Sequence, residues 1–265
     1  MPLPRVGAFT AALLLAAGAL AACSAGGQDT SSEQNAVSEE RTSPSSSGEE
    51  SRTAAPASCA DLRLDAEGVI AGAQLGPCLA DGLAQAGTLR STQYSAGEQT
   101  GHSDVVIVPE LAISGTSSVG GTESRVVSVG GETWADLGDG WVHGDESSSN
   151  PVEVIVAQAG QVALATMNPQ AIADGIASCP SWRVDAQRAE LRSEGGVEAG
   201  AVPVRCEGTL TLGGVQVQDA AVFFRPDWTP LGTEGTGVFA GVSSAFAAHY
   251  YDHGAQISVQ PPVGQ

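Results

Sequence analysis

The chain has 265 residues, with 30 Asp and Glu against 11 basic residues, all of them Arg, so its formal net charge is −19. The absence of Lys excludes Schiff-base and pyridoxal chemistry, which need a Lys amine, and a Walker-type phosphate loop. The acidic balance disfavours nucleic acid as a partner, because phosphate contacts need a basic surface.

Residues 1–22 have the pattern of an export signal, in which Arg5 is the only charge before an apolar run over residues 6–22. The run ends in Leu20-Ala21-Ala22-Cys23, which resembles the lipobox of bacterial lipoproteins. That resemblance implies that Cys23 is the first mature residue and carries a diacylglycerol thioether. We therefore expect an exported protein held by lipid at the outer face of the cytoplasmic membrane. The alternatives are an ordinary signal peptide and a short anchor helix with an incidental Cys.

Residues 23–57 are rich in Ser, Thr, Glu and Pro, and Val37 is the only large apolar residue among them. Such a segment cannot bury enough surface to offset its ordering entropy. It is predicted to be a disordered tether between the lipidated Cys and a single folded domain over residues 58–265.

Four cysteines follow the tether: Cys59, Cys78, Cys179 and Cys206. An even number in an exported chain indicates disulfides, and four cysteines allow three pairings. The pairing of sequence neighbours, Cys59 with Cys78 and Cys179 with Cys206, is the simplest. A metal site is the competing interpretation, but no Cys-x-x-Cys pair or Cys/His cluster favours it.

In the folded part, helices are expected over three short segments, residues 78–86, 151–159 and 169–178. The first follows Gly76-Pro77, and the other two follow the pairs Asn150-Pro151 and Asn168-Pro169, in which Asn caps a helix that begins with Pro.

Strands dominate the rest of the domain. Alternation predicts one strand over residues 202–212, with an apolar face from Val202 to Leu212 and a solvated face that includes Pro203. It pairs with the segment around Trp182 in an irregular hairpin. Further strands are expected at residues 105–108, 125–129 and 221–224, and a hairpin joins 132–137 to 141–143 through Gly138-Asp139-Gly140. Residues 239–251 suit either a helix or a strand. This order of elements is typical of an α+β fold with an antiparallel sheet.

Two groups of residues could bind a metal. His249 and His253 would share one face of a helix, but no third ligand is identifiable. Four carboxylates gather near the 132–143 hairpin, although their spacing does not fit a calcium loop: Asp136, Asp139, Asp145 and Glu146. Turn chemistry explains Asp139-Gly140 without an ion.

No Gly-x-Ser-x-Gly nucleophile elbow occurs, and the nearest segment, residues 241–245, ends in Ala. No carboxylate pair is singled out by its spacing. We therefore expect no enzymatic activity, no metal and no cofactor.

The layout of residues 113–142 is distinctive: Ser114-Gly115-Thr116, then the strand at 125–129, then Trp134 and Trp141. The Asn150-Pro151 helix, the strand pair around Trp182 and Cys206, and Phe223-Phe224-Arg225-Pro226-Asp227 follow. This order resembles actinobacterial envelope lipoproteins of the LppX/LprAFG kind, which are similar in fold to the LolA/LolB carriers. The similarity covers most of residues 78–260.

The resemblance implies a curved antiparallel half-barrel, with helices covering its concave face and an apolar cavity that takes a lipid, a glycolipid or an acyl chain. Alternation and aromatic placement then suggest the lining residues: Val106, Val108, Trp134, Trp141, Trp182, Val204, Leu210, Val222, Phe224 and Phe246. The alternative is an envelope interaction or scaffold module whose core is filled.

Overall fold

The computed structural model describes residues 54–262 except residues 66, 120–121, 213 and 240–241. The expected signal peptide, Cys23 and the tether up to residue 53 lie outside the described residues.

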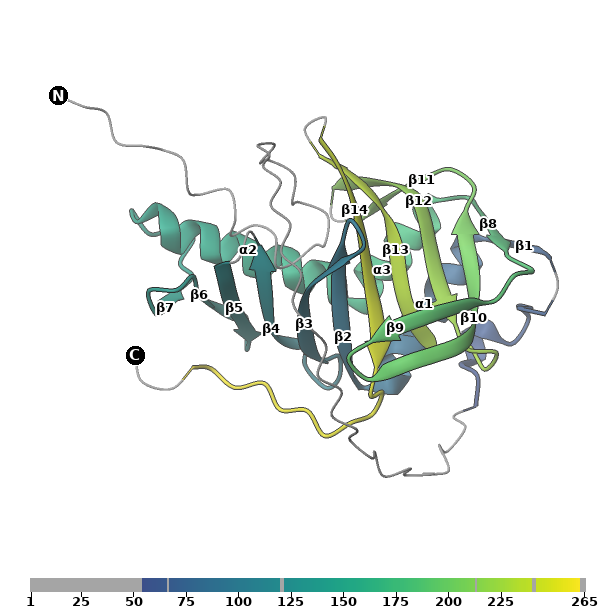
Figure 1. Ribbon diagram of the computed structural model, residues 1–265, viewed down its shortest axis with the longest axis horizontal. Helices are drawn as coiled ribbons and strands as arrows, with labels where there is room; N and C mark the ends of the chain where they lie inside the picture. The colour runs from purple at the N-terminus through teal and green to yellow at the C-terminus, as the bar shows by residue number, and fades with distance from the viewer. Residues whose placement is uncertain (1–53, 66, 120–121, 213, 240–241, 263–265) are drawn as a thin grey trace, which may run out of the picture.

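Within the described part, fourteen strands form one antiparallel sheet in the order β1-β8-β10-β12-β13-β14-β2-β3-β4-β5-β6-β7, while β9 pairs with β10 and β11 with β12. The sheet is curved and does not close, because β1 and β7 do not pair with each other (Figure 1). The strands are β1 (Val69–Ala71), β2 (Thr88–Ser95), β3 (Glu98–Val106), β4 (Ala112–Val119), β5 (Thr122–Val129), β6 (Glu132–Asp136), β7 (Trp141–His143), β8 (Ser181–Val184), β9 (Ala189–Ser193), β10 (Gly196–Cys206), β11 (Thr209–Leu212), β12 (Val215–Phe224), β13 (Pro230–Phe239) and β14 (Val242–Tyr251).

Helices α1 (Gly72–Ala86), α2 (Pro151–Met167) and α3 (Pro169–Ser178) lie on one side of this sheet, and a 3-10 turn, η2 (Ala57–Cys59), precedes them. The α+β class with a curved antiparallel sheet is therefore confirmed. No helix among the described residues is both long and apolar enough to cross a bilayer.

The two Asn-Pro helix starts are confirmed. The Asn150 side chain accepts a hydrogen bond from the Val152 N–H, and the Asn168 side chain accepts from the N–H groups of Gln170 and Ala171. These bonds satisfy N–H groups that have no partner inside a helix.

Two helices are longer than the sequence indicated. Helix α2 was expected to end at residue 159 but continues to Met167, and α1 begins at Gly72 rather than residue 78, with Pro77 inside it. Gly76 and Gly160 are points of close approach rather than helix ends. A Cβ on Gly76 would lie 2.4 Å from the Ala173 carbonyl oxygen of α3, and one on Gly160 would lie 1.8 Å from Thr133 Oγ1 of β6.

The strand expected over residues 202–212 is divided into β10 and β11 at Glu207-Gly208, where the Glu207 N–H donates to the carbonyl of Ser181. The apolar face is buried as expected, but Pro203 on the opposite face is buried too. The reason is a second apolar cluster beneath the β9–β10 hairpin on the convex face, formed by Leu191, Ala201, Ala221, Phe223 and Leu231.

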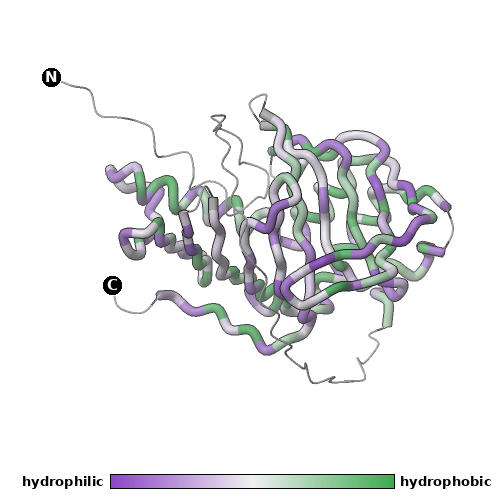
Figure 2. Tube along the Cα trace, in the orientation of Figure 1, coloured by the Kyte–Doolittle hydropathy of each residue, from purple (hydrophilic) through white to green (hydrophobic). Residues whose placement is uncertain are grey.

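The ambiguous segment 239–251 forms the end of β13 and strand β14, which lies between β13 and β2. The hairpin of residues 132–143 is confirmed, because β6 and β7 pair from Trp134–His143 to Asp136–Trp141. Apolar and polar residues alternate along many of the strands (Figure 2). The main core lies between the concave face of the sheet and the helices.

Candidate functional site

A cavity of about 140 Å³ lies between the concave face of the sheet and all three helices. Its helical wall includes Leu79, Leu83, Val162, Thr166, Met167, Ile172 and Ile176. Its sheet wall includes Gln93, Trp182, Leu210, Leu212, Val215, Val217, Ala220, Val222, Thr233, Phe246, Ala248 and Tyr250. The cavity is thus a void inside the main core, and its wall is mostly hydrocarbon.

The burial of these side chains separates the floor of the cavity from its rim. Leu79, Trp182 and Val222 are at most 1% exposed and form the floor. Val162 and Thr166 of α2, with Leu212 and Val215 of the β11–β12 hairpin, are half-buried. Phe246 and Ala248 of β14 are half-buried as well, so the rim of the cavity runs along the C-terminal half of α2, this hairpin and β14.

The expected lining residues fall into three groups. Trp182, Leu210, Val222 and Phe246 line the cavity. Val204 and Phe224 are fully buried in the same core without reaching it.

The remaining four are a correction to the expected lining. Val106, Trp134 and Trp141 lie on the convex face, where they form a separate cluster with Val259 of the C-terminal segment. Val108 follows the end of β3 and is 44% exposed. Alternation identified an apolar face in these strands, but it could not show which side of the sheet that face is on.

The sequence did not predict several of the lining residues, because it indicated no strand at β13 and left β14 as either a helix or a strand. Thr233, Ala248 and Tyr250 belong to these strands. Burial raises the pKa of the Tyr250 phenol, and its hydrogen bond to the Thr233 side chain partly offsets that rise. Alternation within residues 244–250 was the signal that could have found Ala248 and Tyr250.

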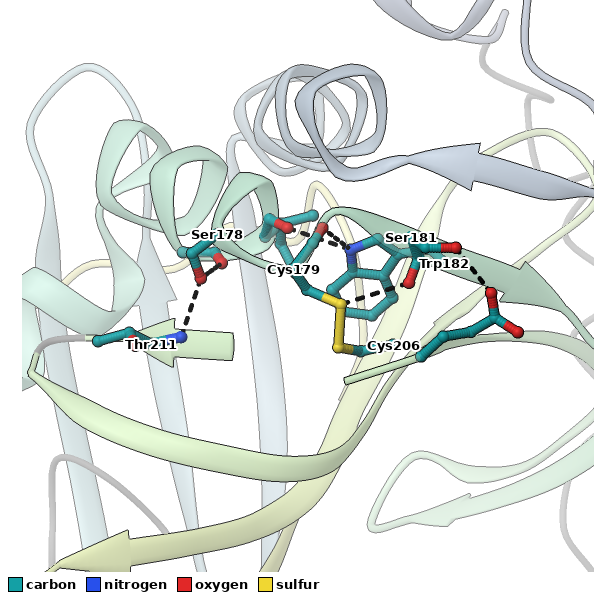
Figure 3. The surroundings of a disulfide bond; sticks show 9 residues. Ser178, Cys179, Ser181, Trp182, Cys206 and Thr211 are labelled. Carbon is teal, nitrogen blue, oxygen red and sulfur yellow. Dashed lines mark hydrogen bonds between the residues drawn. A yellow bond between two sulfur atoms is a disulfide. The ribbon is translucent and has the colours of Figure 1, made fainter. Parts of the chain in front are cut away.

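The wall formed by α3 is attached to the sheet at the point where the helix ends. The disulfide between Cys179 and Cys206 joins this end to β10. Beside it, Trp182 Nε1 donates to the carbonyls of Ile176 and Cys179, each at 3.1 Å (Figure 3). Ser178 Oγ also accepts a hydrogen bond from the Thr211 N–H at 2.9 Å. One disulfide and three hydrogen bonds therefore hold this side of the cavity in place.

The second disulfide, between Cys59 and Cys78, attaches η2 to α1. Both bridges are those that the nearest-neighbour pairing favoured.

Asp136 and Asp145, near the β6–β7 hairpin, accept hydrogen bonds from backbone and side-chain groups of the protein itself. Asp136 Oδ1 accepts from the N–H groups of Gly138 and Gly140, at 2.9 and 3.1 Å, and Oδ2 pairs with Arg125. Asp145 Oδ1 accepts from the N–H and hydroxyl of Ser147. These oxygens therefore act as hydrogen-bond acceptors for the N–H groups of turns. Among the described residues, no group of three metal-ligating side chains occurs.

The two histidines are bound to different backbone carbonyls. His249 Nδ1 lies 2.6 Å from the Arg192 oxygen, and His253 Nε2 lies 2.7 Å from the Pro230 oxygen. Burial lowers the pKa of His253. The strand character of β14 removes the helical geometry on which a shared face for the two rings depended.

No protein-family model matches this chain, and no curated protein matches it by sequence. Among solved structures, it is similar to the crystal structure of LprF from Mycobacterium bovis, with a TM-score of 0.45 and 11% sequence identity. The match covers 72% of this chain and 98% of that chain. At this identity and TM-score, the likeness bears on neither ligand nor activity.

Proposed function

We propose that this protein is a lipid-anchored envelope protein that binds an acyl chain, as part of a lipid or glycolipid, in the cavity between its sheet and its helices. The observation that carries the proposal is the cavity itself: about 140 Å³ of space, walled mainly by hydrocarbon and opening at a half-buried apolar rim. Apolar cavities of this order stay dry and accept apolar guests.

The size of the cavity sets what it would hold. A void of this volume takes a guest about as large as benzene, and so the end of an acyl chain rather than a whole lipid. Each buried methylene contributes about 0.8 kcal/mol, so a chain that enters through the rim gains affinity without any catalytic group. The polar end of the ligand would remain at the rim between α2 and the β11–β12 hairpin.

Two further features support an exported, anchored protein. The two disulfides are typical of proteins that mature in an oxidising compartment. The Leu20-Ala21-Ala22-Cys23 sequence supplies the site for the lipid anchor, and residues 24–57 supply the tether. A Cys23→Ser variant should appear in the medium instead of the membrane fraction, and a variant that remains firmly membrane-bound would contradict the anchor.

The ligand is tested by native mass spectrometry on the full chain carrying Cys23→Ser, with organic extraction of the same sample. A co-purifying mass that extracts as lipid supports the proposal and identifies the ligand class. A protein that carries no ligand, and whose mass is unchanged after incubation with saturated fatty acids, would instead favour the interaction module with a filled core.

A cavity-filling variant makes the test specific to the site. Ala248→Phe places a ring in the cavity from β14 and should abolish acyl-chain binding while thermal unfolding stays cooperative. Ala245→Phe is the matched control, because Ala245 is an exposed residue of the same strand and does not line the cavity. Equal loss of binding in both variants would place the ligand elsewhere.

A further inference from the structure

A second, smaller cavity adjoins the first beneath α2. It has a volume of about 20 Å³, room for about one water molecule. Its wall consists of Gln93, Ser103, Ile113, Gly115, Val126, Ala163 and Met167. Gln93 and Met167 also line the larger cavity, so these two side chains form the partition between the two spaces.

The strand side of this partition is held in place. Gln93 Nε2 donates to Ser103 Oγ at 3.3 Å, and Ser103 Oγ in turn lies 2.8 Å from Ser91 Oγ. The side-chain oxygen of Gln93 lies over Gly101 of β3, so close that a Cβ there would be only 3.1 Å away. Gln93 therefore has little freedom to move.

The helix side of the partition can move. Met167 is the last residue of α2, is half-buried, and is the only methionine after Met1. Its side chain is unbranched and has three rotatable bonds, so it fills irregular space and changes rotamer at small energetic cost. A rotation of this side chain would join the two cavities.

The second cavity suits a continuing hydrocarbon chain. Small side chains leave the space open beneath α2, since Gly115 and Ala163 face it, while Ile113 and Val126 provide an apolar floor. Every buried side-chain nitrogen and oxygen of the described residues has a hydrogen-bond partner, so the polar wall groups do not require a water molecule there.

We propose that Met167 sets the length of the acyl chain that the protein accepts, by closing the space beneath α2 in one rotamer and opening it in another. This inference rests on the proposed function. A short chain ends in the first cavity, whereas a longer chain displaces the Met167 side chain and continues along the concave face under α2.

The test measures the affinity of saturated fatty acids of 8 to 18 carbons for the full chain carrying Cys23→Ser, by displacement of a fluorescent fatty acid. In the parent protein, affinity should rise about fourfold per added methylene until the cavity is full, and then level off. Met167→Ala should move that plateau to longer chains and tighten their binding by on the order of tenfold. Met167→Trp should move it to shorter chains.

Leu164→Ala is the matched control, because Leu164 is also a half-buried residue of α2 but lines neither cavity. Its plateau should match that of the parent. If fatty acids bind but the plateau is the same in Met167→Ala, Met167→Trp and the parent, the proposed role of Met167 is wrong and the acyl-binding function stands. If no fatty acid binds to any variant, both are overturned.

Discussion

Asp136 uses both oxygens of its carboxylate in bonds within the protein. Its side chain is 9% exposed, and its two oxygens receive two turn N–H groups and the Arg125 guanidinium. The hydrogen bond from the Gly138 N–H, followed by that from Arg125, lowers the pKa of this carboxyl below its usual range. Both bonds favour the charged form, so the hairpin is most stable while Asp136 is ionised.

The direction of the pH dependence follows from this shift. Because the folded pKa is below the unfolded value of about 3.9, the contribution of Asp136 to stability is complete above that value. It is lost as the pH falls through the folded pKa. Urea denaturation from pH 7 to pH 3 should show Asp136→Asn to be less stable than the parent at pH 7, and its stability should fall less steeply below pH 4.

Asp139→Asn is the control for this series, because Asp139 lies in the same turn but is exposed. It should follow the parent at every pH. Identical profiles for Asp136→Asn and Asp139→Asn would show that the Asp136 hydrogen bonds do not contribute to stability.

At the level of elements, the position of α2 depends on Gly160, although glycine disfavours the interior of a helix. Gly160 lowers helix propensity, yet it lies in the middle of α2, where the helix backbone approaches Thr133 of β6. Thr133 cannot turn aside freely, since its Oγ1 lies 2.9 Å from Ser128 Oγ in the buried face of the sheet. Packing of the helix on the strands therefore outweighs intrinsic propensity at this position.

Gly160→Ala should consequently destabilise the protein, although the same change stabilises an exposed helix. The expected loss is about 1–3 kcal/mol in the free energy of unfolding, because α2 must move away from β6. Urea denaturation measures it. The double variant Gly160→Ala with Thr133→Ala should recover part of the loss relative to the sum of the single variants, since it removes the contacts with Thr133 Oγ1 and Cγ2 and leaves only that with Cβ, at 2.5 Å. Strict additivity would contradict the contact.

At the level of the whole molecule, the two disulfides connect segments that the sheet does not join. Cys59–Cys78 spans 19 positions and attaches η2 to α1, while Cys179–Cys206 spans 27 and attaches α3 to β10. The sheet is open at β1 and β7, so the helices on its concave face are not enclosed by strands on all sides. The Cys179–Cys206 bridge restricts how far the end of α3 can separate from the sheet, whereas Cys59–Cys78 holds η2 against α1.

Removal of either bridge should lower the free energy of unfolding by about 3 kcal/mol, from the loop-closure entropy that the unfolded chain regains. Paired Cys→Ala variants and urea denaturation provide the measurement. The Cys179–Cys206 variant should also lose hydrogen-exchange protection in α3 before the rest of the chain, whereas the Cys59–Cys78 variant should not. Equal α3 protection in both variants would show that the hydrogen bonds of Trp182 and Ser178 are sufficient.

Much of the fold could be predicted from local patterns. The Asn-Pro caps of α2 and α3, the hairpin of β6 and β7, and the buried face of β10 depend on neighbouring residues and are readable along the chain. The internal extent of α1 and α2 was not readable, because Gly76, Pro77 and Gly160 have the local character of helix ends. Contacts with α3 and β6 make them interior positions.

The sequence by itself determined the class of fold and the apolar faces of several strands, since these follow from periodicity and order along the chain. It favoured neighbouring cysteines as partners but left three pairings open, and the folded structure has the neighbouring ones. Only the tertiary structure decided on which side of the sheet each apolar face lies. It placed Trp182 and Val222 in the cavity wall, and Trp134 and Trp141 on the convex face beneath the C-terminal segment. The physical reason is that alternation separates two faces of a strand but gives both the same period, and only the packing of distant helices and segments makes one of them concave.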